Sequence, residues 1–436
     1  MASILRPGNI RDFTIHGKKG SQDLSGNLSE HDSKSTLADI RYYENVLSNV
    51  ITLKVGVKET DDLLDKLPIR GGEKVDIVLE DYNGKKLKPT LYVNKVRNVV
   101  SDSLENNYFI DLASEQYFKN DLSRVVARYD GKISDSVTKI MKDKLDADVD
   151  VDETLINYNF IGNNRKPLYV CTWLAAKSIP AKPGEGTAGY LFFETQDGFQ
   201  FKSIDGLFSQ KSKRNYVLTN TPFKPNEYDG QVLKYSVDRD INLQNNLAVG
   251  AYSNRSIYFN FYDYKYVDQE FSVKDEVIKT GGKNPIQASI EKFGDEPSRI
   301  MTRILDVGTL PAGKSTEDEL ETWKSDPSNP TFNAPKTMVQ SVMRYNQMFA
   351  IKINITIAAD FTLKAGDLVH CDFPEVSTSK SSGLNKESSG IYMISSLCHS
   401  ITPGETYTSL TLVRDTFGRK PFKTGGGSKT EDVLLY

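Results

Sequence analysis

Two separated stretches of the chain share one pattern of apolar residues and glycines, and this internal repeat restricts the fold more than any other feature. Residues 67–79 (LPIRGGEKVDIVL) align without a gap with residues 361–373 (FTLKAGDLVHCDF), and residues 91–100 (LYVNKVRNVV) align with residues 392–401 (YMISSLCHSI). Such self-similarity indicates two copies of one structural unit. The matched pairs are Ile69 with Leu363, Gly72 with Gly366, Val75 with Val369, Ile77 with Cys371, Leu79 with Phe373, Val93 with Ile394 and Val96 with Leu397.

The strands expected on either side of these stretches also correspond. Residues 51–57 alternate apolar with polar or small residues, and residues 351–357 do the same with four isoleucines. Alternation with period two is typical of a strand that has one buried face. Each copy then ends in a further apolar strand, NYFIDLA in the first and TSLTLVRD in the second. Short strands separated by glycine turns predict a small antiparallel β-barrel in each copy.

The segment between the copies has a different pattern. Residues 134–146 carry apolar side chains three to five positions apart, and they predict a helix. Residues 165–179 predict a second helix with a proline near its first turn, and residues 188–208 predict a hairpin. The aromatic run at 257–271 predicts a strand rather than a base-stacking platform, because a platform would need more interleaved basic residues. This middle region is therefore expected to be mixed α+β.

The predicted fold class is mainly β with α+β insertions: two similar small antiparallel β-barrel domains of the tube type and a mixed middle region. A chain of 436 residues exceeds the size that a single core supports, which agrees with several domains. The expected divisions are a polar N-terminal arm (1–37), the first barrel (38–133), the α+β middle domain, which can contribute a strand or two to the second barrel (134–300), a linker (301–340), the second barrel with C-terminal strands (341–420), and a flexible Gly/Ser tail with an apolar tip (421–436).

Composition excludes several classes of protein. The formal net charge of −3 disfavours nucleic-acid binding as the main task, and no specific nucleic-acid sequence is expected as a partner. Three widely separated cysteines form no disulfide framework, so folding in a reducing compartment such as a cytoplasm is expected. The N-terminus lacks the apolar core of a signal peptide, and no apolar run reaches the roughly 18 residues of a spanning helix, so no membrane insertion is expected.

Two dipeptides, His370-Cys371 and Cys398-His399, raise the question of a metal site. Each dipeptide lies in a predicted strand, where adjacent side chains point to opposite faces. Four ligands from these residues cannot easily converge, and no dense Cys-x-x-Cys spacing supports zinc. Cys371 is more simply a small core residue, since its match in the first copy is Ile77. No metal site is predicted.

A second motif, GTLPAGKS at residues 308–315, matches the phosphate-binding pattern G-x-x-x-x-G-K-[ST]. The helix that would follow begins with three acidic residues, which would place carboxylates where phosphates bind. No buried parallel strand with a metal-binding aspartate follows either. A surface turn before an acidic linker is the favoured interpretation, and a nucleotide hydrolase using Lys314 remains the alternative. No catalytic residue and no cofactor is predicted, so the chain is not expected to be an enzyme.

The C-terminal segment KTGGGSKTEDVLLY combines a Gly/Ser spacer with a short apolar tip. Such a tip can dock on a partner, and the other interpretation is a disordered tail. The residues of this possible docking segment are Asp432, Val433, Leu434, Leu435 and Tyr436.

The C-terminal pattern LKAGDLVHCDFPEV…SSGIYMISSLCHSI…YTSLTLVRDTFG resembles the last domains of the central baseplate hub protein of contractile-tailed, T-even-like bacteriophages. Two mid-chain segments resemble the same family, RKPLYVCTWLAAKSI…GYLFFETQDGFQFKSIDGLF and SRIMTRILDVGTL. The resemblance covers about residues 38–420, while the N-terminal arm and the Gly-rich tail have no clear counterpart in the family.

This resemblance implies a homotrimer in the virion tail baseplate, assembled in the host cytoplasm. Two similar barrels in each chain would give the ring pseudo-sixfold symmetry, so that it connects the sixfold tail tube to a threefold central spike. The implied partners are a spike protein that can carry a lysozyme domain, the tail tube or a tube-initiator protein, and other baseplate proteins. The ring would enclose a channel for the genome. The alternative is a glycan- or cell-surface-binding tail protein, motivated by the many Tyr and Phe residues.

Overall fold

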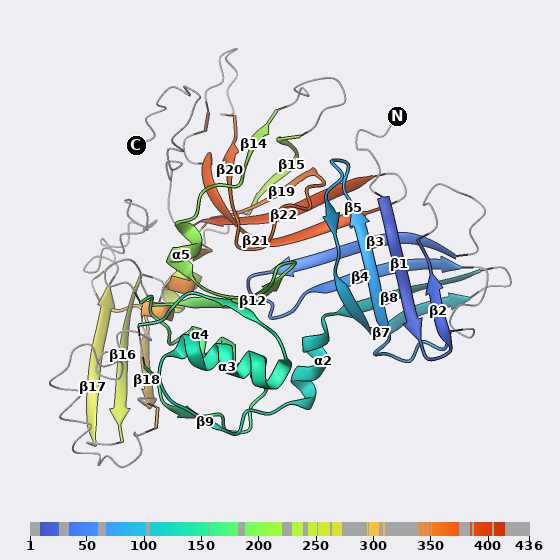
Figure 1. Cartoon of the computed structure of the whole chain (residues 1–436). Helices are drawn as coiled ribbons and strands as arrows, with labels where there is room; N and C mark the ends of the chain where they lie inside the picture. Colours follow the sequence, from blue (N-terminus) through green and yellow to red (C-terminus); the bar gives the residue numbers. More distant parts are fainter. Residues whose placement is uncertain are drawn as a thin grey trace.

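Fourteen strands join into one continuous sheet that holds both copies of the repeat (Figure 1). The structure of the chain, a computed structural model, describes residues 9–25, 35–59, 67–101, 105–155, 157–181, 188–219, 229–238, 243–250, 252–261, 264–272, 294, 296–304, 308–309, 340–342, 344–346, 348–349, 351–374, 384–385, 388–402 and 405–414. The mainly β fold class predicted from the sequence is confirmed.

The second copy closes into a barrel of six strands. Around the barrel the strands pair in the order β21-β20-β14-β15-β19-β22, and β22 pairs back with β21. β14 runs parallel to both β20 and β15, so the barrel is mixed rather than purely antiparallel as predicted. The strands are β14 (Arg214–Leu218), β15 (Gln231–Asp238), β19 (Ile351–Ala358), β20 (Leu368–Asp372), β21 (Gly390–Ile401) and β22 (Thr406–Arg414).

The first copy contains six strands in the equivalent order, β1-β5-β7-β8-β4-β3. Among the described residues no pairing joins β1 to β3, so this copy is an open version of the same barrel. Its strands are β1 (Asn9–Gly17), β3 (Ser35–Asn45), β4 (Thr52–Glu59), β5 (Lys74–Glu80), β7 (Thr90–Ser101) and β8 (Asn106–Ala113), with β2 (Gly20–Asp23) paired to β1 and β6 (Lys86–Leu87) paired to β5.

The N-terminal segment differs from the expected polar arm. Where the structure describes residues 1–37, they form β1, β2 and the start of β3 rather than an arm. Phe13 and Ile15 are fully buried in the core, and β1 pairs antiparallel with β5. A bulge separates these two residues from the partly buried Ile10, and the other residues of β1 are mostly polar, so the alternation could not be recognised in the sequence.

Strand register matches between the copies. Val93 of β7 pairs with Leu112 of β8, and the matched residue Ile394 of β21 pairs with Leu412 of β22. Directly after each of these pairs the register shifts by a β-bulge. Bulges bend a strand locally and are kept at defined positions. The repeat predicted from the sequence is therefore present in the pairing and in its irregularities.

A second pair of bulges repeats the correspondence at the outer strands. Leu37 of β3 pairs with Val57 of β4, and Val232 of β15 pairs with Ile357 of β19. A register shift follows in each case. β15 is thus the second-copy equivalent of β3, a relation that the short sequence match did not reach.

The matched glycines occupy the same turn in both copies. Gly72 has φ +88° and Gly366 has φ +89°, in the left-handed region that favours glycine. The Gly72 N–H donates to the Val93 carbonyl at 2.7 Å, and the Gly366 N–H donates to the Ile394 carbonyl at 2.8 Å. One backbone geometry is therefore built twice from different side chains.

β3 and β21 join the two copies. The second half of β21 pairs antiparallel with β3, from Ile401 opposite Ile40 to Ser396 opposite Asn45. Apolar residues of both copies belong to a single buried cluster. The two copies therefore share one sheet and one core, and together they are called the β-unit here.

The middle region packs beside this unit around a core of its own (Figure 1). The predicted helices are α3 and α4, and the predicted hairpin is β12–β13, although its last residues form the short helix α5. Helix α2 was missed by the sequence prediction. The elements are α2 (Glu115–Leu122), β9 (Arg128–Tyr129), α3 (Ile133–Leu145), β10 (Val149–Val151), β11 (Phe160–Ile161), α4 (Pro167–Ala175), β12 (Tyr190–Thr195), β13 (Gly198–Ser203) and α5 (Ile204–Phe208).

A small separate sheet completes the described structure, in the order β17-β16-β18. The aromatic run predicted as a strand forms parts of β16 and β17, which pair antiparallel. The elements here are α6 (Leu243–Ala248), β16 (Ser253–Asn260), β17 (Lys265–Ser272) and β18 (Ile300–Ile304).

The equivalent glycines provide a matched pair of substitutions. Gly72→Ala and Gly366→Ala both place an L-residue in the left-handed region, at a cost of about 1–2 kcal/mol each. A Cβ at residue 366 would also lie 3.1 Å from the Phe193 ring and 3.3 Å from Leu207, whereas nothing lies within 4 Å at residue 72. We expect Gly366→Ala to lower the apparent free energy of unfolding by a further ~1–3 kcal/mol. Urea unfolding of both variants checks this, and equal effects would contradict it.

Candidate functional site

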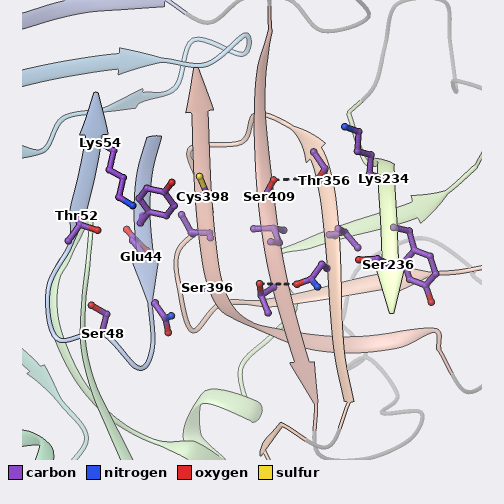
Figure 2. A pocket seen from close by; sticks show the side chains of 18 of the residues that line it. Glu44, Ser48, Thr52, Lys54, Lys234, Ser236, Thr356, Ser396, Cys398 and Ser409 are labelled. Atoms are coloured by element: carbon purple, nitrogen blue, oxygen red, sulfur yellow. Dashed lines mark hydrogen bonds between the residues drawn. The ribbon is translucent and has the colours of Figure 1, made fainter. Parts of the chain in front are cut away.

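A concave surface of the β-unit lies where the two copies meet. A hollow of about 770 Å³ is lined by residues from β3, β4, β15, β19, β21 and β22. Figure 2 shows these strands side by side, with their polar side chains projecting from one face. The opposite face of the same strands carries the shared apolar core. The alternation of side chains along each strand thus separates a buried apolar face from a polar concave face.

The second-copy part of this face is lined mainly by uncharged polar groups. The Thr411 hydroxyl donates to Asn354 Oδ1 at 3.1 Å, and the Thr356 and Ser409 hydroxyls lie 3.5 Å apart (Figure 2). These are cross-strand pairs between β19 and β22. The surface is polar without concentrated charge, apart from Lys234 on β15.

The first-copy part is charged, and its charges are largely compensated. Arg41 Nε lies 2.8 Å from an Asp39 carboxylate oxygen, and Arg97 Nε lies 3.0 Å from Asp111. The Lys54 ammonium lies 5.4 Å from the centre of the Tyr43 ring. The same backbone in the two copies therefore carries two different polar surfaces.

A buried carboxylate fixes the corner where the two copies and the middle region meet. Glu44, at the end of β3, is 2% exposed. It accepts hydrogen bonds from the Tyr42 hydroxyl at 2.8 Å, the Gln196 N–H at 2.6 Å and the Ala365 N–H at 2.9 Å. Gln196 belongs to the β12–β13 turn and Ala365 precedes β20. One side chain thus connects three parts of the chain.

A second buried carboxylate lies nearby. Glu194 of β12 accepts a hydrogen bond from the Ile51 N–H at 2.9 Å, which ties the middle region to the start of β4. Burial raises the pKa of both Glu44 and Glu194 to about 7, against the lowering effect of their hydrogen bonds. The junction therefore contains two carboxyl groups that titrate near neutral pH.

The two His/Cys dipeptides lie as strand geometry predicts. Cys371 is fully buried in the shared core, while His370 on the other face lies 3.6 Å from Asp372. His399 is buried beside the rings of Tyr42 and Phe361, whereas Cys398 lies on the concave face. Burial lowers the pKa of His399 to about 3. The prediction of opposite faces and of a core role for Cys371 is confirmed.

Other predicted features lie wholly or partly outside the described residues. Asp432–Tyr436, the possible docking segment, is outside them, and so are Lys314 and most of the 301–340 linker. Of the GTLPAGKS motif, only Gly308 and Thr309 are described, and the Thr309 N–H donates to the Asn159 carbonyl at 2.7 Å. Within the described part of the chain, no cluster of three or more His, Cys, Asp or Glu side chains could hold a metal ion. None of the described helices has the length and apolar character needed to cross a membrane.

Comparison with known proteins gives structural but not sequence relatives. No protein-family model and no curated protein matches the chain. The tail protein from Neisseria meningitidis MC58 matches with a TM-score of 0.52 at 10% identity, covering 93% of this chain and 96% of that one. The 43 kDa tail protein of prophage MuSo2 from Shewanella oneidensis matches with a TM-score of 0.52 at 9% identity, covering 93% and 98%. The chain has the fold of phage tail proteins.

This tail-protein fold spans almost the whole chain and includes the middle region as well as the two β-copies. The resemblance drawn from the sequence is confirmed at the level of fold. The low identity explains why short patterns such as the glycine turn were the only sequence signal. Sequence reasoning missed the buried junction, because Glu44 and Glu194 are ordinary glutamates until the fold brings them into the interior.

The buried carboxyls predict a pH-dependent stability. A glutamate in the unfolded chain has a pKa of about 4.3. Between that pH and about 7 the folded state holds protons on these two carboxyl groups that the unfolded state has lost, so their contribution to stability falls as pH rises. Each group contributes a slope of up to about 1.4 kcal/mol per pH unit. We expect Glu194→Gln, which keeps an acceptor for Ile51, to change the slope in urea unfolding between pH 5 and 7 by up to about 1.4 kcal/mol per pH unit, so that stability falls less steeply, or rises more steeply, with pH than in the parent protein. Buried His399, whose pKa is lowered to about 3, contributes a slope of the opposite sign that is the same in both proteins and cancels from the comparison.

Glu115→Gln is the control for this experiment, because Glu115 forms only an exposed i,i+4 ion pair with Lys119. It should leave the pH slope unchanged. A Glu194→Gln variant with the slope of the parent protein would show that the junction does not titrate as expected.

Proposed function

We propose that this protein is the structural hub of a phage tail baseplate, a homotrimer that adapts a threefold central spike to the sixfold tail tube. The observation that carries the proposal is the duplication with matched register and matched bulges. A sixfold tube end presents six equivalent patches. Three chains can meet them only if each chain offers two similar surfaces. The tail-protein fold supports a structural role in a tail.

The concave face supports the further proposal of a channel for genome passage. In a ring, the concave polar face would line the lumen and the apolar core would lie behind it. Hydroxyl and amide groups in the second copy and ion-paired side chains in the first leave few uncompensated positive charges to hold phosphates. Such a lining would let a polyanion pass without tight binding.

The proposed partners follow from this geometry. One side of the ring would contact the tail tube or a tube-initiator protein, the other would hold the spike protein, and the rim would contact other baseplate proteins. The protein would act in the baseplate of a contractile tail after assembly in the host cytoplasm. It would work without catalysis, through shape and symmetry.

Molecular mass in solution is the direct test. We expect light scattering of the purified chain at micromolar concentration to give three times the chain mass when it is alone, and that mass plus the mass of the bound spike when it is mixed with its spike protein. Negative-stain electron micrographs should show rings with a central hole. A stable monomer under both conditions, with no rings, would refute the hub proposal.

A further inference from the structure

Two strand edges of the β-unit have no partner among the described residues. β7 pairs with β5 at residues 90–92, and Val93 forms backbone hydrogen bonds with Gly72 and Glu73. No described strand pairs with the rest of that edge, from Asn94 to Ser101. β15 pairs with β14 only at residues 231–232, which leaves its edge open from Lys234 to Asp238. Unpaired edges of this length are unusual on the surface of a native protein, because they expose backbone hydrogen-bond donors and acceptors that can pair with another chain.

These two edges are the equivalents of the strands that already join the copies. β7 corresponds to β21 and β15 corresponds to β3, as their registers and bulges show. β21 and β3 pair antiparallel within the chain. The first copy thus has a free β21-type edge, and the second copy has a free β3-type edge. The chain carries one formed junction and the two halves of another.

Within the described residues the two halves do not pair with each other, because six strands separate them in the order β7-β8-β4-β3-β21-β22-β19-β15. We propose that β7 of one chain pairs antiparallel with β15 of the next, repeating the β21–β3 junction between chains. This proposal rests on the proposed ring and names its contact. The contact is heterologous, so it closes into a ring when the rotation between chains allows.

The internal junction also sets the register of this contact. β7 has a further bulge between Arg97 and Val100 that β21 lacks, so beyond it the equivalence moves by one residue from the ungapped sequence match. Val100 pairs with Asn107 as Ser400 pairs with Tyr407, so Val100 is the equivalent of Ser400. On the other side, Ser236 pairs with Asn354 as Arg41 pairs with Lys54, so Ser236 is the equivalent of Arg41.

Ser400 lies opposite Arg41 in the internal junction. Val100 of one chain therefore lies opposite Ser236 of its neighbour, and Ser101 lies opposite Tyr235.

Side-chain exposure agrees with a covered edge. Val99 is 50% exposed and Val100 is 65% exposed, although β-branched residues in a strand usually pack against a neighbour. Ser400, the equivalent of Val100 at the formed junction, is only 1% exposed. Pairing with β15 of another chain would bury the two valines and satisfy the backbone groups of both edges.

A disulfide across the predicted pair tests the contact. Opposed residues of antiparallel strands have Cα atoms about 4.5–5.5 Å apart, within the range that a disulfide bridges. We expect the full-length double variant Val100→Cys/Ser236→Cys, after mild oxidation, to give a covalent ladder on a non-reducing gel. Its largest band should contain as many chains as light scattering finds in the ring, and reductant should return every band to one chain. Both positions are exposed, so folding should be unaffected, which circular dichroism checks.

Val100→Cys/Val237→Cys is the register control, because a slip of one residue moves a side chain to the other face of the strand. This variant and the parent protein should stay uncrosslinked, because Cys171 and Cys371 are buried and Cys398 is half-buried on the concave face, away from the β7 and β15 edges. A ring of the expected mass without crosslinks in the first variant, or with equal crosslinks in both, overturns the β7–β15 pairing and leaves the hub proposal standing. A monomer without crosslinks overturns both.

Discussion

The pairing of β3 with β21 is the contact on which the rest of the structure depends. It runs across six opposed residue pairs and turns two small barrels into one curved sheet with one core. Strand pairing fixes both the register and the face of the sheet on which each side chain lies. The β3–β21 pairing therefore decides which side of all the neighbouring strands is polar. The concave face is therefore a consequence of how the copies are joined, rather than a property of either copy alone.

The copies show which features of the barrel are required and which are free to vary. Strand order, register, two bulges and the glycine turn are retained, because each sets the curvature of the backbone. The polar faces differ, with ion pairs in one copy and hydroxyl ladders in the other. The first strand also differs: β1 is antiparallel to β5, whereas β14 is parallel to β20. Shape is duplicated while the surface chemistry is not.

The sequence contained the repeat because apolar alternation and glycine turns are local signals. Gly72 and Gly366 were matched correctly since both need the same positive φ, and Cys371 was assigned to the core because Ile77 occupies the equivalent position. Helices α3 and α4 followed from apolar spacing. Strand β1 was missed because its fully buried residues are only Phe13 and Ile15, and a bulge breaks the alternation between them and the partly buried Ile10.

The buried carboxyl groups of Glu44 and Glu194 could not be predicted from the sequence for a different reason. Glu44 accepts hydrogen bonds from backbone groups more than 150 residues away along the chain, and no local sequence pattern indicates such contacts. The equivalence of β15 with β3 was hidden as well, because their side chains differ and only the pairing with β19 and β4 reveals it.

The internal junction also has reinforcements that its proposed counterpart between chains would lack. Tyr42 stacks on His399 across the β3–β21 pair, with ring centres 5.8 Å apart, and donates its hydroxyl to the buried Glu44. The equivalent of Tyr42 in β15 is Val237, which offers neither a ring nor a hydroxyl. Aromatic pairs contribute about 0.5–1.5 kcal/mol beyond simple burial. The contact inside a chain should therefore form first and hold more tightly, so that each subunit is complete before it meets its neighbours.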